Sequence, residues 1–384
     1  MSILGLSLTL IEFALFGVLA VAFIYQSFFY MHYIMAVLIN NRRNEKNKNH
    51  FTKNYLPVSV IICVKNEDEN LLKNLPLILK QEYPARFEVI VVNEGATNET
   101  DIIISKLKRK YKNLKSTFVP NGIKLIVPRK LAVTLGVKAA LNEWIVFTNA
   151  DCMPKDKFWL KRIARNFLPE TDFVFAHSVM FKTKGLLNKM ITYDSLFRQL
   201  KLFGYALHKK PITSMINNFA LRKSVFINNK GFKKILTLPK GDLELIANRY
   251  SAKNNTRVET ASGSTVWSNA QESFSEWFYS RENEFFINRQ LRFSSILRLS
   301  VEMFFRIVFY LSFIACLLLG NFFTITAAVF LFLIRFFIQY ITINQNSQRF
   351  DGQRYYISVL LFDILLPLID LYIFIFGKKL KKIF

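Results

Sequence analysis

Apolar residues gather at the two ends of this chain, whereas the middle alternates short apolar runs with charged stretches. The first apolar block covers residues 3–39, and between Ile3 and Ile24 it holds a single charged residue, Glu12. About 20 apolar residues cross a bilayer core of roughly 30 Å, which makes a buried core helix the weaker interpretation. No basic residue precedes the block and aromatic residues follow it. An uncleaved transmembrane anchor over residues 1–39 is therefore favoured over a signal peptide.

The C-terminal quarter is apolar again, and residues 297–377 are predicted to form two or three membrane segments. Residues 303–319 and 322–343 are two continuous candidates. A third candidate, residues 355–376, is interrupted by Asp363, Pro367 and Asp370. Such residues inside an apolar segment favour an irregular or protein-facing element.

Basic residues beside these blocks predict the orientation of the chain. Residues 40–54 form a polar, basic linker, which the positive-inside rule places in the cytoplasm with the N-terminus outside. Three full C-terminal spans would leave the basic tail, residues 378–384, on the outer side, against the same rule. Either residues 355–376 are re-entrant or interfacial, or they form an ordinary kinked span whose carboxylates face other helices.

Residues 55–296 carry charges throughout and are predicted to fold as a soluble α/β domain. Short apolar runs rich in β-branched residues alternate with segments whose apolar residues recur at helical spacing. That order is typical of βαβ units and a mostly parallel sheet. The predicted strands are residues 56–64, 87–92, 115–119 and 144–148, and the predicted helices are residues 71–79, 100–112, 129–141 and 158–167.

Polar clusters directly follow three of the predicted strands: Lys65-Asn66-Glu67, Asn93-Glu94 and Asn149-Ala150-Asp151. Ligands bind at the carboxyl ends of parallel strands, so Glu67, Glu94 and Asp151 are expected to converge on one rim. Carboxylates there can accept hydrogen bonds from a nucleoside or hold a divalent cation that bridges to phosphate. No Gly-rich loop follows the first strand, which argues against a dinucleotide or Walker-type site. The alternative is that the clusters only cap helices, with Asn66 and Asn98 as N-caps.

Composition adds an expected partner. Lys and Arg number 52 against 27 Asp and Glu, a formal net charge of +25, although 52% of the residues are hydrophobic. The charge calls for an anionic partner, and the segregated apolar blocks favour a membrane over nucleic acid, for which no motif is present. The three cysteines, Cys63, Cys152 and Cys316, are far apart and odd in number, which predicts neither a disulfide framework nor a metal site.

Several sequence fragments of the soluble segment occur in a characteristic order. They are residues 58–67, 130–140, 144–154, 220–226, 230–232, 240–245 and 277–283. With apolar spans at both ends, they resemble the membrane-anchored family 2 glycosyltransferases over roughly residues 56–293. The resemblance implies a GT-A fold, a nucleotide-diphospho-sugar donor, and transfer with inversion to a glycan or lipid-linked acceptor. It also implies an inner or plasma membrane location with the catalytic domain in the cytoplasm, in polysaccharide or glycolipid biosynthesis.

The resemblance assigns roles to individual residues. Asp242 falls on the Asp of the family's Glu-Asp pair and is the expected general base, and Asp151 is the expected ligand of Mg²⁺ or Mn²⁺. The residues expected at the nucleotide are Lys65, Glu67, Glu94, Lys130, Asn149 and Arg281, with Lys130 and Arg281 at the diphosphate.

The chain departs from the family pattern at positions that are expected to carry the reaction. Asn149 replaces the first Asp of the Asp-X-Asp motif, Gly241 replaces the Glu of the Glu-Asp pair, and residues 280–284 lack the Gln-X-X-Arg-Trp pattern. A metal held by one carboxylate in place of two is expected to bind weakly, since affinity follows ligand charge. The alternative function is therefore a catalytically impaired member that acts as a membrane binding or scaffold component.

Overall fold

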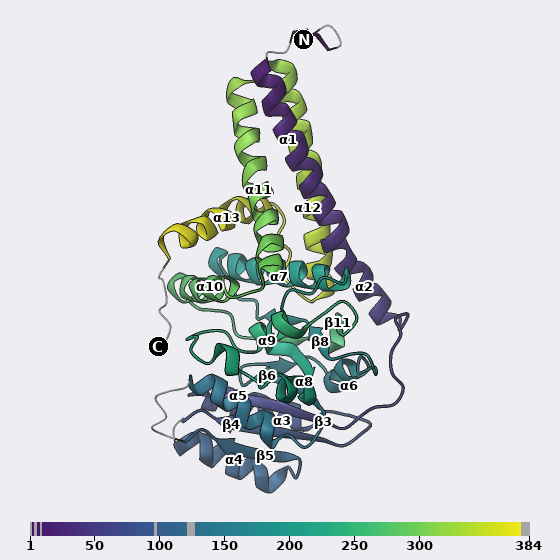
Figure 1. Ribbon diagram of the computed structural model, residues 1–384, viewed down its shortest axis with the longest axis vertical. Coiled ribbons are helices and arrows are strands. Elements are labelled where there is room, and N and C mark those ends of the chain that lie inside the picture. Colours follow the sequence, from purple (N-terminus) through teal and green to yellow (C-terminus); the bar gives the residue numbers. More distant parts are fainter. Residues whose placement is uncertain (1, 4–5, 8–9, 96–97, 121–126, 378–384) are drawn as a thin grey trace.

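The computed structural model describes residues 2–3, 6–7, 10–95, 98–120 and 127–377. The predicted basic tail, residues 378–384, lies outside the described residues. Figure 1 shows long helices standing as a tower on an α/β domain, with the N-terminus at the far end of the tower. The arrangement separates the apolar ends of the chain from its charged middle.

The α/β domain is built on a seven-stranded sheet of order β11-β8-β10-β6-β3-β4-β5. All neighbouring strands pair in parallel except β10, which is antiparallel to β6 and β8. The strands are β3 (Val58–Val64), β4 (Phe87–Asn93), β5 (Leu114–Phe118), β6 (Trp144–Asn149), β8 (Phe173–Ala176), β10 (Phe219–Arg222) and β11 (Thr256–Glu259). The predicted mixed, mostly parallel GT-A-type sheet is thereby confirmed.

Helices cover both faces of this sheet, which explains why its strands are apolar along their whole length. In β3, Ile61 and Cys63 face a core that includes α5, whereas Val60 and Ile62 face the core of α3, α4 and α6. The helices of the domain are α3 (Asp68–Leu79), α4 (Asn98–Lys110), α5 (Pro128–Ala139), α6 (Trp159–Ala164), α8 (Lys223–Asn228) and α9 (Leu243–Tyr250). Short turns of helix are η2 (Ile216–Asn218), η3 (Lys233–Ile235) and η4 (Ser262–Ser264).

A second, three-stranded sheet has the order β7-β12-β9. Its strands are β7 (Met153–Pro154), β9 (Ser178–Met180) and β12 (Val266–Ser268). Beyond β9, helix α7 (Leu186–Leu207) passes beneath the tower (Figure 1). Gly204 of α7 packs against the backbone of Tyr33, where an added Cβ would lie 2.5 Å from the carbonyl oxygen. Glycine is required there because any side chain would push α7 and the first helix apart.

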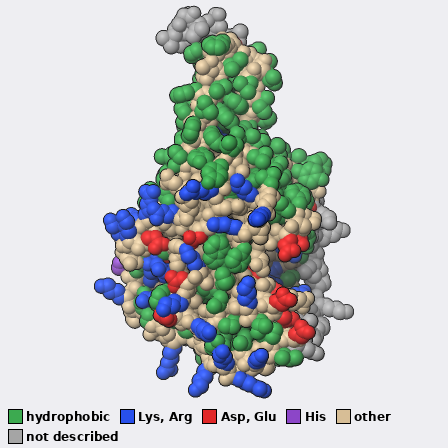
Figure 2. Space-filling view, turned by 180° about the vertical axis from the view of Figure 1, so that it is seen from behind, with side chains coloured by type: hydrophobic (Ala, Val, Ile, Leu, Met, Phe, Trp, Pro, Cys, Tyr) green, Lys and Arg blue, Asp and Glu red, His purple; other side chains and the backbone are tan. Residues whose placement is uncertain are grey.

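Three long helical segments form the tower. They are α1 (Leu10–Phe29), continued by a π-helical turn η1 (Tyr30–Ile34) and α2 (Met35–Glu45), α11 (Phe293–Leu319) and α12 (Phe322–Arg349). Their outer surface is apolar, with Leu318 and Phe322 about four-fifths exposed at 77% and 86%. Figure 2 shows hydrophobic side chains over the tower and Lys and Arg side chains below it. Exposed apolar helices above a basic belt are what a membrane anchor presents to lipid.

Two short antiparallel strands lie at the N-terminal end of the chain, β1 (Ser2–Ile3) and β2 (Leu6–Ser7). The helix predicted to end near residue 39 continues to Glu45, so the beginning of the predicted linker is helical. The alternative of helix capping by Asn66 is wrong, because Glu67 occupies the N-cap position of α3 and makes no side-chain capping bond. The side chain of Asn98 lies outside the described residues.

The last apolar helix, α13 (Ser358–Phe376), runs across the tower and not along it (Figure 1). Within the described residues, four helices including α13 are long and apolar enough to cross a membrane. Pro367 lies inside α13 without interrupting it. Both acidic residues of α13 are paired with arginines: Asp363 with Arg306 and Arg335, and Asp370 with Arg281 of α10 (Phe274–Asn288). These ion pairs hold α13 against α10 and the tower, so both of its carboxylates face other helices.

Candidate active site

The three polar clusters that follow the strands meet at one edge of the large sheet. Cys63 of β3 is in register with Asn149 of β6, and Val64 is in register with Asn93 of β4. The hydrogen bonding between β3 and β4 continues one residue further, because the N–H of Glu94 donates to the carbonyl oxygen of Val64 at 2.9 Å. Parallel pairing therefore places the residues after β3, β4 and β6 on a common rim.

Arg129 lies at the centre of this rim. Its guanidinium donates to Glu94 Oε1 at 3.2 Å, to Asn149 Oδ1 at 3.2 Å and to Asp242 Oδ2 at 3.4 Å. Burial disfavours its charge, yet Asp242 and Glu94 hold the pKa of Arg129 above its ordinary value. Three residues predicted from separate motifs are thus joined by one arginine that the sequence analysis did not select.

Helix geometry explains why Arg129 and not Lys130 reaches the rim. Both residues lie in the first turn of α5, which begins at Pro128, and successive side chains on a helix point about 100° apart. Lys130 is 1% exposed, and its Nζ donates to the carbonyl oxygen of Leu238. The signal available in the sequence was the Arg-Lys pair directly after a proline, a residue favoured at the first helical position.

Glu67 and Asp151 form a second part of the rim. Burial, followed by the negative charge of Asp151, raises the pKa of Glu67, and burial raises the pKa of Asp151. Within the described residues, neither carboxylate is in an ion pair with a Lys or Arg side chain, and Asp151 Oδ1 accepts a long hydrogen bond from Cys152 Sγ at 3.5 Å, beside backbone hydrogen bonds to its carboxylate that include one from Asn269. Two partly buried carboxylates without a cation would gain most from a bound positive charge.

The donor set here fits a hard divalent cation in part. Mg²⁺ keeps several waters and takes one or two carboxylates together with substrate phosphates, so it does not need a complete protein cage. Asp151 and Glu67 supply such carboxylates, whereas the amide oxygen of Asn149 already accepts a hydrogen bond from Arg129. No group of three or more His, Cys, Asp or Glu side chains in the described part of the chain is arranged to hold a metal by itself.

Asp242 reaches the rim from the start of α9, where it contacts Arg129. It is the N-cap of α9, where its side chain accepts a hydrogen bond from the Leu243 N–H, and Gly241 before it has a positive φ of 85°. Its backbone N–H donates to Glu244 Oε2 at 3.1 Å. Burial, followed by the charge of Asp242, raises the pKa of Glu244 to about 8. Glu244 therefore holds a proton at neutral pH, which limits the negative charge beside Asp242.

The remaining predicted residues differ in their position. Lys65 is exposed directly after β3, and its charge acts on Glu94, whose pKa burial raises. Arg281 is engaged elsewhere: it pairs with Asp194 of α7, Glu284 of α10 and Asp370 of α13. These contacts tie α10 to the membrane-proximal helices and do not bring Arg281 into the Arg129 cluster.

Comparison with known proteins relates part of this domain to one family. Residues 59–228, from β3 to α8, match the family described as "Glycosyl transferase family 2". Glycosyltransferase AglE of Haloferax volcanii is 32% identical over 106 residues, covering 27% of this chain and 33% of that protein. Probable glycosyltransferase YdaM of Bacillus subtilis is 26% identical over 231 residues, covering 58% of this chain and 53% of that protein. The chain thus spans from a third to about half of the length of these curated relatives.

One solved structure matches nearly the whole chain. It is the mannosyltransferase PcManGT from Pyrobaculum calidifontis in complex with GDP-Man and Mn²⁺. The match has a TM-score of 0.52 at 15% sequence identity and covers 91% of this chain and 99% of that one. At this identity the likeness establishes the fold. Residues 59–228 of this chain therefore resemble the family 2 glycosyltransferases in sequence, and the chain has a GT-A-like fold carried between long apolar helices.

Proposed function

We propose that this protein transfers a sugar from a nucleotide-diphospho-sugar to a glycan or lipid-linked acceptor, with inversion at the anomeric carbon. The observation that carries the proposal is the Arg129 cluster at the strand ends of the family 2 segment. A partly buried cation held between Glu94, Asp242 and Asn149 is suited to meet the charge of a departing diphosphate. The acceptor class is favoured by the apolar tower, which holds the domain at a lipid surface.

Transfer with inversion is a single displacement. The acceptor hydroxyl oxygen forms a bond to the anomeric carbon on one face while the bond to the diphosphate oxygen breaks on the other. Asp242 takes the proton of the acceptor hydroxyl, and the nucleoside diphosphate leaves with the bonding electrons. Glu67, Glu94 and Lys65 lie at the β3 and β4 ends, where a nucleoside would bind.

Asp151, with Glu67, would hold a Mg²⁺ or Mn²⁺ ion. When bound, such an ion neutralises charge on the diphosphate. Arg129 contributes positive charge from the protein itself, so a weakly held ion is compatible with turnover. The raised pKa values of Glu67 and Asp151 mean that ion binding weakens as the pH falls, beginning at a higher pH than for ordinary carboxylates.

The proposed orientation puts the catalytic domain in the cytoplasm, at the inner or plasma membrane. The first long helical segment ends next to the catalytic domain and carries exposed basic residues there. They are Arg42, Arg43, Lys46 and Lys48. With α1, α11 and α12 as spans and α13 along the interface, the C-terminal tail returns to the same side. That arrangement satisfies the positive-inside rule for both basic segments.

The experiment that tests the function measures the melting temperature of the full chain in detergent with GDP, UDP and their sugar conjugates, each with and without Mn²⁺ or Mg²⁺. A donor at about 100 times its dissociation constant stabilises by roughly 2.7 kcal/mol, which gives a shift of several degrees. We expect a metal-dependent shift that Asp151→Ala abolishes and that the surface variant Glu82→Gln retains. No shift with any nucleotide from a cooperatively melting protein would favour the scaffold function.

Replacing Arg129 separates the contribution of the protein cation from that of the metal. Arg129→Met keeps the volume of the stem but leaves Glu94 and Asp242 facing one another without their cation. We expect donor affinity at saturating Mn²⁺ to fall by about tenfold to a hundredfold, in line with loss of one charge-assisted hydrogen-bonding group. Lys130→Met, which alters the neighbouring residue that points away from the rim, is the matched control. Equal effects of the two substitutions on donor affinity would refute the role of Arg129.

A further inference from the structure

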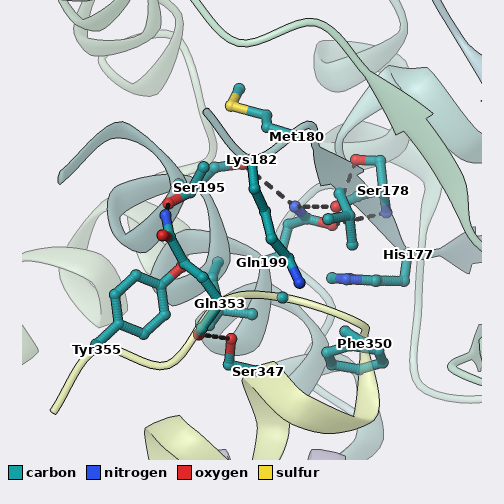
Figure 3. Close-up of a pocket in the computed structure, with 14 residues that line it drawn as sticks. His177, Ser178, Met180, Lys182, Ser195, Gln199, Ser347, Phe350, Gln353 and Tyr355 are labelled. Carbon is teal, nitrogen blue, oxygen red and sulfur yellow. Dashed lines mark hydrogen bonds between the residues drawn. The ribbon is translucent and has the colours of Figure 1, made fainter. Parts of the chain in front are cut away.

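A small cavity opens between the catalytic domain and the base of the tower (Figure 3). Its volume is about 20 Å³, and its walls come from β9, α7 and the segment between α12 and α13. A space of this size accepts one or two water-sized polar groups. The lining combines apolar surface with neutral polar side chains, among them Ser178, Ser195, Gln199 and Gln353, and Lys182 is directed inward in Figure 3.

His177 is the unusual member of this lining. It is 1% exposed, and neither ring nitrogen has a hydrogen-bond partner within the described residues. The ring stacks on Phe350 at a centroid distance of 3.7 Å, so its orientation is fixed. Burial lowers the pKa of His177 to about 3, which keeps the imidazole neutral. A buried imidazole whose two nitrogens lack hydrogen-bond partners destabilises the folded protein unless a bound group supplies those partners.

The polar groups around His177 are held in place by one another. Gln199 Oε1 accepts from the Ser178 N–H at 3.0 Å, and Gln199 Nε2 donates to the Ser178 carbonyl oxygen at 2.8 Å. On the opposite wall, Ser347 Oγ donates to the carbonyl oxygen of Gln353 at 2.7 Å. The cavity therefore has preformed polar walls from two parts of the chain, as binding sites usually do.

A short turn connects this cavity to the candidate active site. In η2, Asn217 Oδ1 accepts from Asn149 Nδ2 at 3.0 Å, while the next residue, Asn218, donates to the carbonyl oxygen of His177 at 2.7 Å. The small sheet gives a second connection: Val266 of β12 pairs with Ser178 on one side and with Pro154 on the other. Two strand spacings, roughly 10 Å in all, thus separate the cavity from the strand that follows Asp151.

We propose that this cavity is a subsite for a hydroxyl-bearing edge of the acceptor glycan, which rests on the proposed function and names part of its substrate. A neutral imidazole presents one donor and one acceptor that point in different directions, and two neighbouring hydroxyl groups, one accepting and one donating, satisfy them. A phosphate would call for several cations or a charged imidazole, whereas Lys182 is the one cation in this lining. The aromatic faces of Phe350 and Tyr355 supply apolar walls beside the hydroxyl groups.

The test uses the full chain in phosphatidylcholine nanodiscs without nucleotide. Methyl α-mannoside and methyl β-glucoside are the probes, inorganic phosphate is the anionic comparison, and the melting temperature and tryptophan fluorescence are the readouts. We expect saturable glycoside binding that weakens at least about tenfold in His177→Phe, which keeps the stack on Phe350 but removes both ring nitrogens. His50→Phe, a substitution at an exposed histidine, should leave binding unchanged.

Gln353→Leu supplies a second variant, because it alters the wall between α12 and α13 without touching the sheet, and it is expected to weaken glycoside binding as well. Three results would overturn the proposal: no saturable binding to the unaltered chain, which would indicate a site for buried water only, binding of phosphate alone, or glycoside binding by both cavity variants that equals binding by the unaltered chain. Donor binding is measured separately, so failure of the subsite can be distinguished from failure of the proposed function. A protein that shifts with a nucleotide-sugar but not with glycosides would keep the function and lose the subsite.

Discussion

Asp242→Asn is expected to lower the rate of sugar transfer by about 10²–10⁴-fold, the usual contribution of a positioned general base, while donor binding stays close to that of the unaltered protein. The substitution removes the group that takes the acceptor proton. Asn is also a favourable N-cap, so α9 should keep its first turn, and the side-chain oxygen can still accept from Arg129. The measurement is nucleoside diphosphate release with acceptor present, beside donor affinity from melting shifts.

The surface substitution Glu82→Gln is the control for the loss of one carboxylate, because Glu82 and its partner Lys157 are both more than half exposed. Its rate of transfer should match that of the unaltered chain. If Asp242→Asn retains most of its transfer activity while donor binding is intact, Asp242 is not the base. If donor binding is lost together with transfer, the cluster with Arg129 serves binding and not proton transfer.

Asp363→Asn is expected to have the largest effect on stability, a loss of about 3–5 kcal/mol. Asp363 is fully buried, with Oδ2 2.7 Å from Arg335 Nη2 and Oδ1 3.5 Å from Arg306 Nη1. Tyr310 donates a further hydrogen bond to Oδ2 at 2.6 Å. Neutralising Asp363 leaves Arg335, which is 1% exposed, without its carboxylate in an environment of low dielectric. The measurement is thermal and denaturant unfolding of the full chain in one detergent.

Asp370→Asn is the matched control, because it lies on the same helix and is also paired with an arginine. Asp370 is about one quarter exposed, and its partner Arg281 keeps Asp194 and Glu284, so a loss of no more than about 1 kcal/mol is expected. The double variant Asp363→Leu with Arg335→Leu removes both charges and should regain part of the stability. Equal unfolding of Asp363→Asn and Asp370→Asn would show that the Asp363 pairs do not hold α13.

The sheet and the rim were open to prediction because each rests on local patterns. The four predicted strands appear as β3, β4, β5 and β6 with ends shifted by one or two residues, and their parallel pairing brings Glu94 and Asn149 to one edge. The antiparallel strand β10 and the small sheet were not predicted. Those strands are only two to four residues long, too short for an apolar period to be recognised.

The sequence could not predict the role of a residue where that role depends on the direction of its side chain or on partners far away in the chain. Arg129 and Lys130 are adjacent and chemically alike, and only the start of α5 decides that Arg129 turns to the rim while Lys130 turns to Leu238. Arg281 was expected at the diphosphate, but three carboxylates from separate helices engage it. His177 belongs to no sequence motif, and its unmatched ring nitrogens are recognised only when α7 and the end of α12 pack around it.

The chain's own order of apolar and charged residues determined the membrane-anchored α/β architecture, because hydrophobic periodicity and length act within one segment at a time. Two alternatives for residues 355–376 remained equal on that basis. The tertiary structure decided which charges meet, because Arg306, Arg335 and Arg281 lie on three other helices and pair with Asp363 and Asp370 of α13. Such pairings join residues up to 89 positions apart, and no local pattern encodes which charges will meet when the helices pack.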